Sequence, residues 1–267
     1  MALATIPVQS AIEPLRDRLN LIWVMLWQAF MPRQRRESMK LVWVFLEPMG
    51  QLALLVALFA LIGRTGGYGR SFALFLLTGI VVLQIFNRGS EQIALSIEKA
   101  NSPRRMPDAG LFHGAIAQTM FQWLTAAIYA PVLAYVVWWW YRVEVVPAHP
   151  EVLLLAVALT GMLAFGIGLI RGYCRRFLPV GERLFKTLSR GLILISGVFY
   201  MASWLPPDYR YVLSYNPILQ LIELVRLGVY FEYPTTLFSM TYLMSWCLGS
   251  VTFAMALIWV SRKRLRE

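Results

Sequence analysis

The sequence predicts an all-α polytopic membrane protein, and three observations support this fold class. Hydrophobic residues make up 58% of the 267-residue chain and charged residues only 15%. A soluble domain carries about 25% charged residues, because its surface has to be wetted. Long apolar runs recur along the chain, and basic residues gather in the short segments between them. This arrangement is typical of a chain that crosses the bilayer several times.

Six apolar segments are predicted to span the membrane. They lie at about 41–62, 71–87, 114–141, 151–170, 187–205 and 236–260, each close to the length of about 20 residues that a crossing helix needs. Residues 41–260 would therefore form the transmembrane domain, between a cytoplasmic N-terminus at 1–40 and a basic cytoplasmic tail at 261–267. Two polar stretches, 88–112 and 171–190, are predicted to be loops outside the membrane.

Two further segments are predicted to be helical without crossing. Residues 11–28 form an amphipathic pattern whose apolar run is too short to cross, and Trp23 and Trp27 suit the membrane interface. An ordinary buried helix is the alternative. Residues 208–233 contain Glu223 and Arg226, and ionisable groups facing lipid are unfavourable. We therefore expect short re-entrant or periplasmic helices before the last span.

The distribution of basic residues predicts the orientation. Most of the 25 lysines and arginines fall before the first span, in the second and fourth connections and in the tail. The opposite side carries Arg64, Arg70, Arg142, Arg210 and Arg226. Because cytoplasmic loops are enriched in lysine and arginine, both termini are predicted to be cytoplasmic.

Several function classes are excluded by missing motifs. The two cysteines and two histidines have no zinc-type spacing, so no metal site is predicted. The spans lack the nucleophile–base or metal-ligand patterns of an intramembrane hydrolase. No G-x-x-x-x-G-K-[ST] loop occurs, so the chain is not expected to hydrolyse ATP itself. The basic residues follow the topology and do not indicate nucleic acid. A permease driven by a separate ATPase remains, with a stand-alone secondary transporter of a small solute as the alternative.

Three stretches resemble a known family. Residues 41–48 read LVWVFLEP and are similar to the start of the first span in ABC-2 type exporters. Residues 97–101, IEKAN, are similar to the segment that this family uses as a coupling helix. Residues 215–218, YNPI, continued by IELVR at 222–226, resemble its Asn-Pro signature before the last span. In this order they most resemble the capsular-polysaccharide export permeases of the Kps type.

The resemblance implies the ABC-2 (type V) exporter architecture and a set of partners. Two copies of the permease would pair with two ATPase subunits and move a lipid-linked acidic polysaccharide across the inner membrane. A periplasmic polysaccharide co-polymerase or adaptor and an outer-membrane export channel would carry the polymer onward. No cofactor is expected on this chain, since ATP and Mg would bind the ATPase. Export of O-antigen or teichoic acid remains the alternative within this architecture.

Candidate functional residues fall into three groups. An acidic polymer favours a basic path with aromatic faces for its sugar rings; the candidates for this path are Arg33, Arg35, Arg36, Lys40, Gln84, Arg88, Tyr200, Trp204, Tyr209, Arg210, Tyr211 and Tyr215. The first four could instead mark topology and bind anionic lipid, and the aromatic residues could form an interfacial belt. Coupling to the ATPase is assigned to Ile97, Glu98, Asn101, Arg104 and Arg105, with a solvated loop as the alternative. Structural roles are assigned to Glu47, Pro48, Asn216, Pro217, Glu223 and Arg226, and Glu47 is expected to pair with a basic neighbour.

Overall fold

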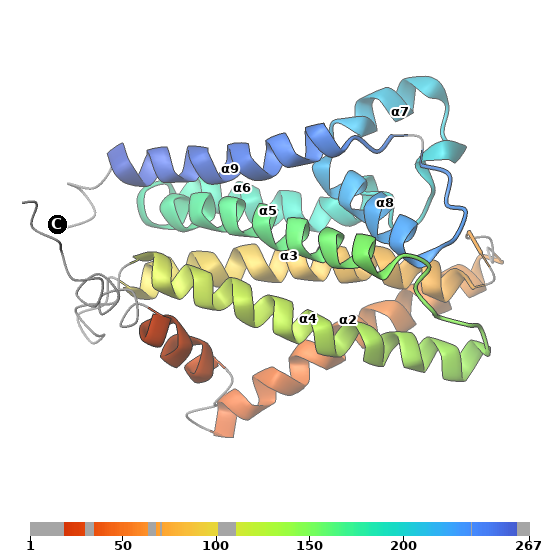
Figure 1. Cartoon of the computed structure of the whole chain (residues 1–267), viewed down its shortest axis with the longest axis horizontal. Coiled ribbons are helices and arrows are strands. Elements are labelled where there is room, and N and C mark those ends of the chain that lie inside the picture. Colours follow the sequence, from red (N-terminus) through yellow and green to blue (C-terminus); the bar gives the residue numbers. More distant parts are fainter. Residues whose placement is uncertain are drawn as a thin grey trace, which may run out of the picture.

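The computed structural model describes residues 19–29, 35–63, 68–69, 71–100, 111–235 and 237–260, and these residues form helices and connections without a strand. The main helices run roughly along one long axis (Figure 1). A short helix, Leu19–Ala29, comes first. The labelled elements are α2 (Arg35–Leu61), α3 (Phe72–Ala100), α4 (Leu111–Tyr141), α5 (Pro150–Phe177), α6 (Pro179–Ile195), η1 (Ala202–Trp204), α7 (Pro207–Ser214), α8 (Pro217–Val229) and α9 (Met240–Val260).

Four helices are long and apolar enough to cross a membrane. They are Phe72–Glu98, Phe112–Tyr141, Pro150–Phe177 and Met240–Val260, within α3, α4, α5 and α9. The predicted class of an all-helical polytopic membrane protein is confirmed at this level. The first predicted span, 41–62, lies in α2, but the apolar helical part found there, Phe45–Leu61, is shorter than these four.

Three predicted boundaries differ from the structure. The helix of the second predicted span continues to Ala100, so Arg88 lies inside α3 and residues 88–100 are not a loop. Residues 171–190 are helical too, as the end of α5 and the start of α6. The fifth predicted span, 187–205, is not one helix, because α6 ends at Ile195 and a turn with Gly197 at a φ of +72° precedes η1.

The helix α3 lies at the centre of the bundle. It packs mainly on α5 and α4, while α5 also contacts α9, α8 and α6. The helix α2 slants away from the others (Figure 1), with α3 as its main neighbour. The short helices α7 and α8 gather at the end where α3 begins, and α3, α5 and α9 finish at the opposite end.

The N-terminal helix Leu19–Ala29 rests on this bundle. Its residues Met25 and Gln28 face Gln92 of α3 and Gly114 of α4 across a small cleft of about 90 Å³. Trp23 and Trp27 remain exposed. An exposed tryptophan pair on a short helix suits the membrane interface, as the sequence predicts.

Glycines on α5 allow it to pack closely against α3. A Cβ atom at Gly168 would lie 2.8 Å from the Cβ of Ile93 and 3.0 Å from the backbone oxygen of Ser90. Gly172 likewise lies against Ile97, where a Cβ would be 2.6 Å from the Cδ1 atom. Helices in membranes associate largely through close packing of small residues, so this contact stabilises the centre of the bundle.

Replacing Gly168 by alanine is expected to destabilise the protein by about 1–3 kcal/mol, the usual range for overpacking a dense core. The backbone of α3 would have to shift, since Ser90 contributes a backbone atom to the clash. Thermal unfolding of the detergent-purified chain measures the effect. Gly249→Ala in α9 is the matched control, because a Cβ there meets nothing within 4 Å. Equal melting temperatures for the two variants would contradict the packing argument.

Candidate functional site

Polar side chains connect α2 and α3 near the middle of both helices. The Arg88 guanidinium donates to the Glu47 carboxylate and, at 3.1 Å, to the backbone oxygen of Trp43. Gln84 Nε2 donates to Gln51 Oε1 at 3.0 Å. The members of each helix are four residues apart and so share a face. The basic neighbour expected for Glu47 is thus Arg88.

This pair of charges is only partly shielded. The Arg88 side chain is 19% exposed and that of Glu47 is 55% exposed. A charge of this kind inside a long apolar helix is unfavourable unless it faces water or a partner. Arg88 has a partner on α2 and retains an accessible edge. It can therefore both hold α2 against α3 and face an anion approaching from outside the bundle.

A second ionic cluster joins α3, α5 and α6 at the opposite end from α7. Arg171 Nη2 and Nε donate to the two carboxylate oxygens of Glu182 at 3.1 and 3.3 Å. Arg171 Nη1 also donates to Ser90 Oγ at 2.8 Å. The side chains of Arg171 and Glu182 are only 3% and 7% exposed. A bidentate, buried pair of this kind has fixed geometry.

Arg175 extends this cluster toward the surface. Its Nε atom lies 3.7 Å from Glu182 Oε1 and 3.7 Å from Glu98 Oε2. The Glu98 side chain is 58% exposed, whereas Ile97 beside it is buried against Gly172. Of the residues assigned to ATPase coupling, Glu98 therefore faces outward and Ile97 packs within the chain. Asn101, Arg104 and Arg105 lie outside the described residues.

An exposed aromatic row runs from α7 to α9. The Tyr215 hydroxyl donates to the Tyr211 hydroxyl at 2.7 Å, and the Tyr242 hydroxyl donates to the Tyr215 backbone oxygen at 2.8 Å. Ring centroids lie 5.3 Å apart for Tyr211 and Tyr215, and 6.4 Å apart for both Tyr215–Tyr242 and Tyr242–Trp246. The hydrogen bond with Tyr211 raises the pKa of Tyr215, so this phenol stays neutral. The rings of this row meet edge to face, so the row offers aromatic faces with hydroxyl groups between them.

The other outer candidates lie near this row with different exposures. Trp204 and Tyr209 are exposed. Arg210 is partly buried and donates from Nε to the backbone oxygen of Leu205 at 2.6 Å. Tyr200 is half-buried, and its backbone oxygen accepts from Arg226 at 3.3 Å.

The Asn-Pro signature starts α8. Asn216 Oδ1 accepts from the Ile218 amide at 3.0 Å as the N-cap, and Pro217 occupies the first turn, where a missing amide hydrogen is tolerated. Asn216 Nδ2 also donates to the Ile195 backbone oxygen and to Ser196 Oγ, both at 3.2 Å. One asparagine therefore starts α8 and fastens it to the end of α6.

Arg226 anchors the same helix within the bundle. It is 1% exposed, and its guanidinium lies 3.6 Å from the centroid of the Phe75 ring. It donates to Thr78 Oγ1 at 3.3 Å and to the Val198 backbone oxygen at 3.2 Å. Glu223, one turn earlier, is also buried. Burial raises the pKa of Tyr233, which neighbours Arg226, so that phenol remains neutral.

The similar proteins that were found are capsule export and polysialic acid transport proteins. No family model matches the chain. It is 26% identical over 216 residues to the polysialic acid transport protein KpsM of Escherichia coli, covering 81% of this chain and 83% of the relative. It is 25% identical over 230 residues to the capsule polysaccharide export inner-membrane protein CtrC of Neisseria meningitidis serogroup A, covering 85% of both. It is 22% identical over 217 residues to the capsule polysaccharide export inner-membrane protein BexB of Haemophilus influenzae, covering 79% of this chain and 79% of the relative. The chain is homologous to the capsule export inner-membrane proteins.

The resemblance to KpsM-like permeases inferred from three motifs is thereby confirmed. These relatives are named for transport and export, not for catalysis. Their description as inner-membrane proteins, together with the four long apolar helices, identifies a multi-pass inner-membrane protein. Among the residues that the structure describes, no group of three or more His, Cys, Asp or Glu side chains could hold a metal ion.

In this KpsM-like chain the predicted path residues that the structure describes with side chains lie in two places. Gln84 and Arg88 lie at the α2–α3 contact, and the aromatic candidates lie at the α7 end. Arg33 lies outside the described residues. Arg35, Arg36 and Lys40 occupy the first turns of α2, where the structure describes the backbone alone.

Sequence reasoning missed two sets of residues. Tyr242 and Trp246 extend the aromatic row, and their spacing of four within an apolar span was the available signal. Arg171 and Glu182 form the buried pair, and Arg171–Arg175 repeats at the same spacing on one face of α5. Two arginines on one helix face, of which Arg171 is buried, need an acidic partner. Because residues 171–190 were predicted to be a loop, this need was not recognised from the sequence.

Proposed function

We propose that the chain is the permease subunit of an ABC exporter that moves lipid-linked acidic capsular polysaccharide across the bacterial inner membrane. The observation that supports this most strongly is the similarity to capsule export and polysialic acid transport proteins over about four-fifths of both lengths. A separate ATPase subunit, carrying ATP and Mg, would supply the energy, because this chain has no phosphate-binding loop.

The proposed assembly is a homodimer with two ATPase subunits. A periplasmic polysaccharide co-polymerase or adaptor and an outer-membrane channel would take the polymer onward. Both termini would be cytoplasmic, as the basic residues predict. Exposed apolar side chains on one face of α6, Val180, Leu184 and Leu188, supply a surface for lipid or for a second copy. A bundle of the six predicted spans would leave little room for a glycan, which supports a path between two protomers.

The proposed path begins at basic residues and ends at aromatic ones. Arg33, Arg35, Arg36 and Lys40 would collect the anionic end of the substrate at the cytoplasmic surface. Arg88, with Gln84 beside it, would face the polymer where α2 meets α3. The aromatic row with Trp204, Tyr209 and Arg210 would then support sugar rings near the periplasmic side, with Tyr200 backing it. Stacking on such rings tolerates many sugars, which suits a repeating polymer.

Deleting the gene in its native host tests the function. Surface capsule should be lost while polysaccharide accumulates inside the cell, and the chain expressed from a plasmid should restore export. Retained capsule with loss of O-antigen or teichoic acid would assign a different glycan. Retained surface glycans together with altered uptake of a small solute would indicate a secondary transporter. Co-purification of an ATPase with the tagged chain separates these classes independently.

Reversing the charge at Glu98 is expected to reduce substrate-stimulated ATP hydrolysis several-fold while the protein still inserts. In the proposed complex Glu98 docks against the ATPase, and a like-charge contact there would cost several kcal/mol. The readout is ATPase activity of the purified complex with the Glu98→Arg variant. Glu151→Arg is the control, because it makes the same charge reversal at a side chain of α5 that is 71% exposed and lies outside the coupling segment. Normal coupling in Glu98→Arg, or an equal loss in Glu151→Arg, would contradict the docking role.

A further inference from the structure

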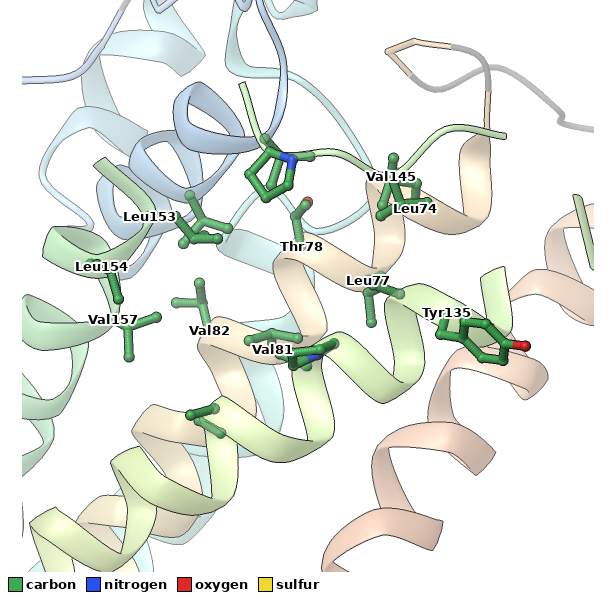
Figure 2. Close-up of a pocket in the computed structure, with 18 of the residues that line it drawn as sticks. Leu74, Leu77, Thr78, Val81, Val82, Tyr135, Val145, Leu153, Leu154 and Val157 are labelled. Carbon is green, nitrogen blue, oxygen red and sulfur yellow. The ribbon is translucent and has the colours of Figure 1, made fainter. Parts of the chain in front are cut away.

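An apolar cavity of about 630 Å³ opens between α3, α4 and α5. Figure 2 shows Val81 and Val82 of α3 on one side of it and Val157 of α5 on the other. Val225 and Val229 of α8 contribute to its wall, and the 144–147 segment borders it. The volume falls within the range of about 300–1,000 Å³ that ligand pockets have. Among the described residues, none that is assigned to the substrate path or to coupling lines this cavity.

The interior of the cavity suits an apolar occupant. Its two threonine hydroxyls are already hydrogen-bonded: Thr78 Oγ1 donates to the Phe75 backbone oxygen and Thr160 Oγ1 to that of Ala156, both at 2.7 Å. Thr78 Oγ1 also accepts from Arg226. The remaining wall deep in the cavity is aliphatic. Water needs several polar partners to remain in a protein interior, and this wall offers few.

The cavity is open at the side of the bundle. Tyr135 on α4 is 59% exposed and Leu154 on α5 is 72% exposed, although both line it. Since α4 and α5 are both apolar enough to cross the membrane, this opening would face lipid once the chain is inserted. An alkyl chain can enter from there without leaving an apolar environment.

Glu144 lines the cavity, and a charge of the opposite sign, Arg142, stands two residues before it at the end of α4. The helix α4 ends in the aromatic run 138–141, which is typical of the membrane interface. Arg142 follows with a φ of 54°, a conformation unusual for a residue other than glycine, and the chain then turns toward Glu144 at the cavity. The Arg142 guanidinium lies 5.2 Å from the Trp139 ring. A cation and an anion two residues apart match the phosphate and ammonium of a zwitterionic phospholipid.

We propose that this cavity binds one acyl chain of a phosphatidylethanolamine-type membrane phospholipid, with its headgroup at Arg142 and Glu144. The bound chain fills space between α3, α4 and α5 that the side chains leave open, and so supports the packing of α4 on the bundle. The site depends on the location of the chain in a membrane and not on which polymer it exports. Loss of the proposed export function would therefore leave this inference standing.

Photolabelling of the full chain in membranes tests the site. The probe is a phosphatidylethanolamine with a diazirine in one acyl chain, and labelled residues are mapped by mass spectrometry. We expect label to concentrate on Leu77, Val81 and Val157, well above the exposed Phe253 and Trp259 of α9. Equal labelling of cavity and outer surface would overturn the proposal, whatever the variants show.

A matched pair of substitutions on α4 sharpens the test. Ala130→Phe places a ring in the cavity, whereas Val132→Phe adds a ring at an exposed position that does not line it. The ring in Ala130→Phe should displace at least two methylene groups of the acyl chain, which should lower labelling of Val81 and Val157 by about tenfold. Labelling of these residues should not change in Val132→Phe. Unchanged labelling in Ala130→Phe would overturn the site.

The headgroup is tested with a second probe. The same diazirine chain on phosphatidylglycerol lacks the ammonium that Glu144 would contact. Phosphatidylethanolamine should label the cavity more strongly than phosphatidylglycerol. In the Glu144→Gln variant the two probes should label it equally. Equal labelling by both lipids in the unmodified chain would overturn the headgroup assignment, as would labelling by the free diazirine fatty acid alone.

Discussion

Replacing Glu182 by glutamine is expected to destabilise the protein by about 3–5 kcal/mol, the usual range when one partner of a buried ion pair is removed. The carboxylate accepts two hydrogen bonds from Arg171, and Arg175 lies 3.7 Å away. Without it, two guanidinium groups would face each other where α3, α5 and α6 meet. Arg171 is 3% exposed, so water cannot compensate for the lost charge. Thermal unfolding in detergent and the yield of monodisperse protein both measure the loss.

Two companion variants separate the ion pair from other effects. Glu151→Gln makes the same change at a side chain that is 71% exposed. It should leave the free energy of unfolding nearly unchanged. The double variant Arg171→Met/Glu182→Leu removes both charges and should recover most of the stability, because an apolar replacement of a buried pair is often neutral. A double variant as unstable as Glu182→Gln would mean that shape, not charge, dominates at this junction.

The sequence predicts the apolar helices better than it predicts their ends. The cores of α3, α4, α5 and α9 follow from runs long enough to cross a membrane. The end of α3 cannot be predicted in this way, because Arg88 and Ser90 look like loop residues in the sequence. Their partners in the folded chain, Glu47 and Arg171, show why they are helical. Such partners lie far away along the chain, and local polarity cannot reveal them.

The candidate residues show the same limit. Pairing of Glu47 with a basic neighbour could be predicted, since a carboxylate in an apolar run needs a cation. The identity of that neighbour could not. Tyr211 and Tyr215 were recognisable because aromatic residues gather near the outer end. Tyr242 and Trp246 instead lie in an apolar span, where aromatic residues usually pack in the core or face lipid. Only the folded chain brings them into one row.

Reversing the charge of Arg88 is expected to reduce polysaccharide export by more than any other single change on α3. Arg88→Glu would set two carboxylates against each other at the α2–α3 contact, where Glu47 now accepts from the guanidinium. It would also present a negative charge to an acidic polymer in a medium where repulsion is several-fold stronger than in water. Arg88→Lys should retain part of the activity, because the charge survives without the planar fork. Surface capsule and the amount of inserted protein are measured together.

The exchange variant Glu47→Arg/Arg88→Glu distinguishes a path role from a purely structural one. It restores opposite charges across α2 and α3, so insertion and thermal stability should return close to normal. Export should stay low, because the Arg88 side chain is 19% exposed and the proposed path needs a cation on α3. If the exchange variant exports capsule at the normal rate, Arg88 serves only to hold α2 in place. Arg88→Gln gives a second check, because it removes the cation without setting two carboxylates together. Reduced export by this variant at normal insertion and thermal stability would support a role in the path, whereas normal export would show that the polymer does not need this cation.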